Sequence, residues 1–73
     1  SVVTLDMMLA QAGTVWFRLY DPKGAKVMQV QKIVAEGRNF IQLPIQSLAN
    51  GVYVLRYQLP SGEENQVRFI KSE

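Results

Sequence analysis

Hydrophobic and polar residues alternate along almost the whole chain, and this period of two most strongly limits the folds it can adopt. Along residues 15–20, aliphatic and aromatic side chains at odd positions alternate with Trp16, Arg18 and Tyr20. Such alternation is typical of a β-strand that buries one face. Residues that favour turns interrupt the pattern every 8–12 residues or so, and no stretch shows the spacing of an amphipathic helix. The sequence therefore predicts a protein built from β-strands.

We expect an all-β fold, specifically a small immunoglobulin-like antiparallel β-sandwich of six to seven short strands. An SH3-like or OB-like barrel is the structural alternative. The third strand, from Val27 to Val34, is longer and less regular, which is compatible with a β-bulge. Residues 7–10 and 47–50 are compatible with short helical turns, which would not change the fold class.

The segment Asp21-Pro22-Lys23-Gly24 is predicted to be a turn. Pro22 fixes its own φ, and the Asp21 carboxylate can accept a hydrogen bond from the nearby backbone. Gly24 can adopt the positive φ that such a turn needs. Asp21 and Gly24 are therefore assigned as structural residues.

A second structural motif is predicted around Leu48, Gly51 and Tyr53, just before another alternating stretch. Leu48 can enter the core, and Gly51 can adopt backbone angles that most residues avoid. Tyr53 can bury its ring and return its hydroxyl to the backbone a few residues upstream. This is the tyrosine-corner arrangement of β-sandwich domains.

Composition argues against catalysis, metal binding and nucleic-acid binding. The 73 residues include no cysteine and no histidine, and the formal net charge is +2. Neighbouring carboxylates occur only at Glu63 and Glu64, where a hairpin tip is predicted, so paired-acid chemistry is not expected. The charges form no basic stripe and the glycines form no phosphate-binding loop. We expect one non-catalytic domain over residues 1–73, without a cofactor, a metal ion or a membrane span.

Two exposed features remain as candidate binding surfaces. Trp16, Arg18 and Tyr20 share the face of their strand expected to point outward, where aromatic rings can stack on sugars or bases. The favoured interpretation gives Trp16 a packing role, in the core or against another part of the protein. The closing strand, residues 66–71, can offer its edge to a partner strand.

Four blocks of the chain together resemble the C-terminal sorting domain of the Bacteroidetes type IX secretion system. The first is Leu19-Tyr20-Asp21-Pro22-Lys23-Gly24-Ala25-Lys26-Val27, and the second is Ile41-Gln42-Leu43. The third is Leu48-Ala49-Asn50-Gly51-Val52-Tyr53-Val54-Leu55, and the fourth is Gly62 followed by Val67-Arg68-Phe69-Ile70-Lys71. The blocks follow the family's order over nearly the whole chain.

The resemblance implies a secretion signal and not an enzyme. It implies that the domain is the C-terminal fragment of a longer secreted protein, whose cargo domain lies N-terminal to it. The partners implied are the type IX secretion apparatus and a sortase-like peptidase, with passage through the periplasm to the cell surface or the medium. The candidate recognition surface lies on the last two strands, at Gly62, Arg68, Phe69, Ile70 and Lys71.

Other hypotheses belong to different functional classes. One is an accessory carbohydrate-binding or fibronectin-like module of a secreted enzyme, for which Trp16 and Tyr20 are the best support. Another is a purely structural spacer. A homodimer through an exposed strand edge is also compatible with the sequence.

Overall fold

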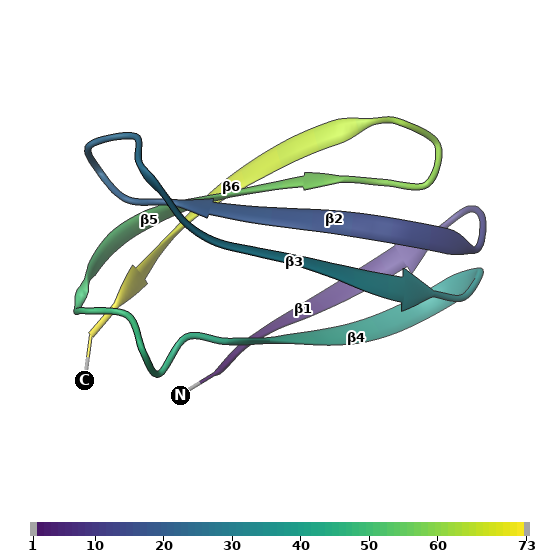
Figure 1. The fold of residues 1–73 in the computed structure, drawn as a ribbon. Coiled ribbons are helices and arrows are strands. Elements are labelled where there is room, and N and C mark those ends of the chain that lie inside the picture. Colours follow the sequence, from purple (N-terminus) through teal and green to yellow (C-terminus); the bar gives the residue numbers. More distant parts are fainter. Residues whose placement is uncertain (1, 73) are drawn as a thin grey trace.

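The computed structural model describes residues 2–72, which form six β-strands connected by short turns (Figure 1). The strands are β1 (Val2–Leu9), β2 (Gly13–Tyr20), β3 (Lys26–Val34), β4 (Gly37–Pro44), β5 (Gly51–Gln58) and β6 (Glu64–Lys71). The described residues contain no helix. The prediction of an all-β fold is confirmed, and the six strands lie within the expected range of six to seven.

The strands form two antiparallel sheets that face each other as a sandwich. Four strands form the larger sheet in the order β3-β2-β5-β6, and β1 pairs with β4 in the smaller one. The chain starts in the small sheet, enters the large one at β2, returns at β4 and crosses back at β5 (Figure 1). This arrangement is consistent with the expected immunoglobulin-like sandwich.

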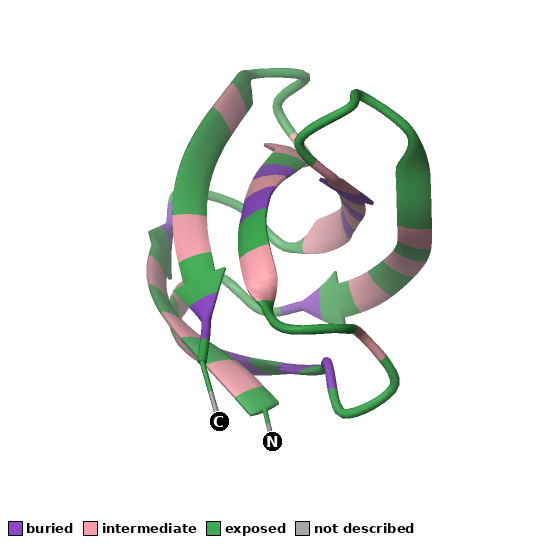
Figure 2. Cartoon of the chain, turned by 90° about the vertical axis from the view of Figure 1, so that its left-hand side faces the viewer, coloured by how far each residue is buried: buried purple, intermediate pink, exposed green. Residues whose placement is uncertain are grey.

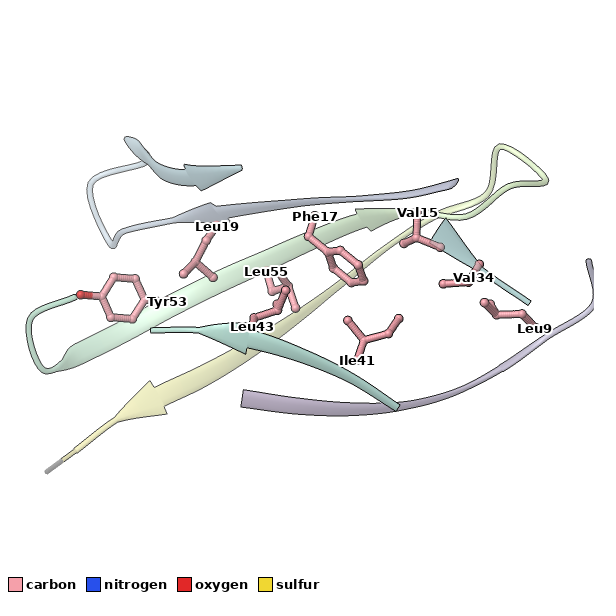
Figure 3. Packing of buried hydrophobic residues seen from close by; sticks show 9 residues of the cluster. All are labelled: Leu9, Val15, Phe17, Leu19, Val34, Ile41, Leu43, Tyr53 and Leu55. Atoms are coloured by element: carbon pink, nitrogen blue, oxygen red, sulfur yellow. The ribbon is translucent and has the colours of Figure 1, made fainter. Parts of the chain in front are cut away.

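The hydrophobic core lies between the two sheets and is formed by side chains that point inward from the strands. The buried residues that cluster there are Leu9, Val15, Phe17, Leu19, Val34, Ile41, Leu43, Tyr53 and Leu55 (Figure 3). Phe17 and Leu55 lie in the middle, with Leu9 and Val34 near one end and Tyr53 at the other (Figure 3). Bands of different burial follow one another along the strands (Figure 2), and in β2, which lies inside the large sheet, the buried Val15, Phe17 and Leu19 alternate with partly exposed residues.

Residues 7–9 are extended and do not form a helical turn. Met7, Met8 and Leu9 continue β1, in register with Asn39, Arg38 and Gly37 of β4. The physical reason is that Leu9 is buried in the core at the end of β1, which an extended backbone allows. Residues 47–50 are also not helical. A single hydrogen bond from the Leu48 N–H to the Ile45 carbonyl closes a turn there.

The irregularity predicted in the third strand is present. Leu19 of β2 pairs with Met28 of β3, but Tyr20 pairs with Lys26, so the register skips Val27. An unpaired residue of this kind is a β-bulge and increases the local twist. It lies next to the turn at residues 21–24.

The outer surface of the small sheet carries an exposed ion pair. Arg38 donates from Nε and Nη2 to the two carboxylate oxygens of Asp6, at 2.9 and 2.7 Å. This hydrogen bonding raises the pKa of Arg38 above its already high value. Both side chains are at least half exposed, so the pair contributes little to stability.

Candidate recognition surface

The Tyr53 side chain ties the beginning of β5 to the loop before it. The Tyr53 hydroxyl donates a hydrogen bond to the Ala49 carbonyl at 2.6 Å. The ring is buried and stacks on Phe69 of β6, with ring centroids 5.7 Å apart, and Leu48 packs against the same core. This is the geometry of a tyrosine corner. The hydroxyl is thus engaged inside the loop that precedes β5.

Gly51 lies in the same corner but is not crowded. Its φ is 158°, a backbone angle that residues with a Cβ rarely adopt, although a Cβ added there would meet only the Tyr53 ring, at 4.0 Å. That separation is an ordinary van der Waals contact. The space around Gly51 therefore does not by itself exclude a side chain.

The turn between β2 and β3 is organised by Asp21. Its Oδ1 accepts hydrogen bonds from the backbone N–H groups of Lys23 and Ala25, both at 2.9 Å. The Gly24 N–H donates to the Asp21 carbonyl at 3.0 Å, and Gly24 has a φ of 88°. A residue with a Cβ is strained at that φ. Asp21 and Gly24 thus shape the turn, with Oδ1 of the carboxylate engaged by the backbone of the turn itself.

Lys71, one of the candidate recognition residues, has its side chain inside the fold. It is 5% exposed, and its Nζ donates to the carbonyls of Ile45 at 2.8 Å, Gln46 at 3.4 Å and Leu48. A buried ammonium group needs such acceptors. The last strand is therefore fastened to the loop that leads into β5. The sequence contained a signal for this position, since Lys71 is in phase with Phe69 on the inward side of β6.

The remaining candidates divide between two locations. Arg68 and Ile70 are exposed on the outward side of β6, and Ile70 is 71% exposed. Gly62 lies in the turn between β5 and β6, near the opposite end of that strand from Ile70, with a φ of 94°. Phe69 is half-buried against Tyr53. The structure thus brings Arg68 and Ile70 together on one surface and leaves Gly62 apart from them.

The outward assignment of Trp16, Arg18 and Tyr20 agrees with the structure. All three are partly exposed, while the residues between them are buried. The Arg18 guanidinium lies 5.8 Å from the centroid of the Trp16 ring. Trp16 is therefore outside the core of this domain. Arg56 of β5, which the sequence analysis did not single out, lies 5.3 Å from the centroid of the Tyr20 ring.

The structure shows no arrangement typical of a metal site. Within residues 2–72, no three Asp, Glu, His or Cys side chains are grouped to hold a metal ion. The part of the chain that the structure describes also contains no helix long and apolar enough to cross a membrane.

These features define a small immunoglobulin-like module whose final strand and β4–β5 loop are joined by side-chain hydrogen bonds. Comparison with family models places the chain in one family. Residues 1–72 match the secretion system C-terminal sorting domain. The chain therefore belongs to this family, the sorting domains of the type IX secretion system. No curated protein and no solved structure matched the chain.

Proposed function

We propose that this domain is the signal that directs an attached N-terminal cargo through the type IX secretion apparatus at the outer membrane. The observation that carries the proposal is the family match, which spans residues 1–72 and not a single motif. The domain acts by being recognised and performs no catalysis. The cargo reaches the cell surface or the medium after it passes through the periplasm.

The recognition surface that we propose is the outward side of β6. Ile70 is a large apolar side chain exposed to 71%, and Arg68 lies two residues before it on the same side of the strand. Among residues 2–72, β6 pairs only with β5, so its other edge can accept a partner strand. The Gly62 turn is a second candidate contact, at the far end of the same strand. A sortase-like peptidase is a candidate partner for later removal of the domain.

Export of a passenger protein tests the proposed function. Residues 1–73 are fused to the C-terminus of a periplasm-targeted fluorescent protein in a Bacteroidetes host, with and without a working type IX apparatus. We expect fluorescence outside the cell only when the apparatus works. The size of the exported passenger shows whether a peptidase has removed the domain. Retention of a folded fusion in the periplasm would contradict the proposal.

Point variants separate recognition from folding better than truncation does. Deletion of residues 67–73 should abolish export, but it also removes most of β6 and the Lys71 hydrogen bonds. Ile70→Ser changes only an exposed side chain and should lower export with little change in stability. The matched control is Phe40→Ser, because Phe40 is 65% exposed on the small sheet. Equal export of both variants would argue against recognition at β6.

A further inference from the structure

The outward surface of the large sheet, which we call the outer face, brings two arginines into direct opposition. Arg18 of β2 and Arg56 of β5 are register partners, so their side chains leave the same side of the sheet next to each other. Like charges directly opposite each other on neighbouring strands are destabilising. Each guanidinium instead lies near an aromatic ring, Arg18 by Trp16 and Arg56 by Tyr20.

Neither arginine has a carboxylate partner among residues 2–72, where the ion pair present joins Arg38 and Asp6 on the other sheet. Arg68 adds a third positive charge, opposite Val54. The nearest acids in register are at the margins. Glu64 lies at the start of β6, and Asp21 directs Oδ1 toward its own turn. Glu64 lies on the same face two residues before Gln66, the register partner of Arg56, but within residues 2–72 it forms no ion pair with either arginine, so the outer face has an excess of positive charge.

Glutamines surround the arginines and the tryptophan. The residues paired with Arg18, Trp16 and Arg56 on neighbouring strands include Gln29, Gln31, Gln58 and Gln66. A primary amide both donates and accepts hydrogen bonds, as a sugar hydroxyl does. A shallow groove of about 330 Å³ lies at the Tyr20 end of this surface, where Arg56 and Gln66 line it together with Asp21 of the adjacent turn.

We propose that the outer face binds an acidic polysaccharide. The sugar rings pack on Trp16 and Tyr20, which are four residues apart on one side of β2, or about 13 Å along the strand. A carboxylate of the polymer is placed between Arg18 and Arg56, where it replaces repulsion with two charge-assisted hydrogen bonds. The glutamine amides take the hydroxyl groups. Ile70, which we assign to sorting, lies on the same face two residues beyond Arg68, whereas the sugar contacts proposed here are made by β2 and β5.

Charge and composition favour a polysaccharide over a nucleic acid. The outer face contains three arginines, of which Arg18 and Arg56 are register partners, whereas a phosphate backbone is usually bound by a longer basic stripe. The chain as a whole has a net charge of only +2. Four neutral amides next to two aromatic rings match uncharged hydroxyl groups better than a continuous line of phosphates.

The test measures binding of the 73-residue chain to polygalacturonate by isothermal titration calorimetry. Neutral dextran, poly-L-glutamate and single-stranded poly(dT) are compared at the same salt concentration. We expect binding to polygalacturonate, weaker binding at higher salt, and none to dextran. Arg56→Gln should weaken binding by roughly tenfold, because a charge-assisted contact is lost. Trp16→Ala should weaken it as well.

The matched control is Arg38→Gln, which removes the same charge from the other sheet and should leave binding unchanged. Arg56→Gln also removes the repulsion between residue 56 and Arg18, so the thermal midpoint of this variant should not fall. A loss of binding therefore cannot be attributed to unfolding. Equal losses for Arg38→Gln and Arg56→Gln would overturn the proposal. So would absence of binding to polygalacturonate, or equal or tighter binding of poly-L-glutamate or poly(dT). None of these outcomes bears on export of a passenger.

Discussion

The Nζ atom of Lys71 lies 2.8 Å from the carbonyl oxygen of Ile45, so the end of β6 is fastened to the beginning of the loop between β4 and β5. The Gln46 and Leu48 carbonyls accept from the same ammonium group. The Tyr53 hydroxyl binds the next part of this loop at Ala49. Two side chains from different strands thus hold one short connection between the sheets.

Replacing Lys71 with methionine should destabilise the domain. The substitution keeps most of the side-chain volume but leaves the loop carbonyls without the ammonium donor. We expect a loss of roughly 1–3 kcal/mol in the free energy of unfolding. Urea denaturation followed by tryptophan fluorescence measures the change. Lys23→Met, at an exposed turn position, is the control and should be nearly neutral. Equal midpoints for the two variants would contradict a structural role for Lys71.

Tyr53→Phe should cost about 1 kcal/mol, the usual net value of one hydrogen bond. The ring remains and can still stack on Phe69, so only the bond to Ala49 is lost. Thermal unfolding followed by circular dichroism is sufficient to detect the change. Tyr20→Phe on the outer face is the control and should unfold at the wild-type temperature. If Tyr53→Phe does the same, the corner does not stabilise this fold.

Gly13→Ala should be destabilising because a Cβ there would lie 2.8 Å from the Cβ of Pro60. Atoms that close must move apart, and overpacking of this kind costs about 1–3 kcal/mol. A double-mutant cycle with Pro60→Gly isolates the contact. We expect Gly13→Ala to cost less when Pro60 is also replaced. Strict additivity of the two substitutions would show that the clash is not the cause.

Self-association through a strand edge stays a prediction. The edges of β3 and β4 that face away from their sheets are both open, and Ile33 on β3 is 89% exposed. Static light scattering over a range of concentrations measures the mass of the species in solution. We expect Ile33→Lys to reduce any association, since a charged edge residue opposes strand pairing. One monomeric mass for the unmodified chain at all concentrations would argue against an edge-mediated dimer.

The sequence was sufficient to predict most of the strands, because period-two alternation shows directly in Val15, Phe17 and Leu19. It was ambiguous at Met7 to Leu9, where a run of apolar residues hides the alternation and a helical turn was equally compatible with the sequence. The strand order could not be predicted, since periodicity does not say which strands pair. The internal position of Lys71 was also missed. Lysine is rarely buried, and its acceptors are carbonyls of a loop more than 20 residues earlier.

On the outer face, too, some residues could be recognised from the sequence and others only from the structure. Trp16, Arg18 and Tyr20 were recognisable as a group because they lie on one strand. Arg56 and the glutamines belong to three other strands, and only the register places them beside that group. A single sequence therefore reveals which residues of one strand share a face, but not which residues of neighbouring strands lie beside them.

The pairing of β1 with β4 has a consequence for the order of folding. Val2 pairs with Pro44 and Leu9 with Gly37, so the entire β2–β3 hairpin lies within the loop that this pairing closes. The β2–β3 and β5–β6 pairs are local hairpins and can form quickly, whereas closing a long loop is entropically slow. During synthesis β1 has no partner strand until β4 has emerged from the ribosome, and its apolar side stays exposed until then. The first strand is therefore where this domain is most open to capture by a chaperone.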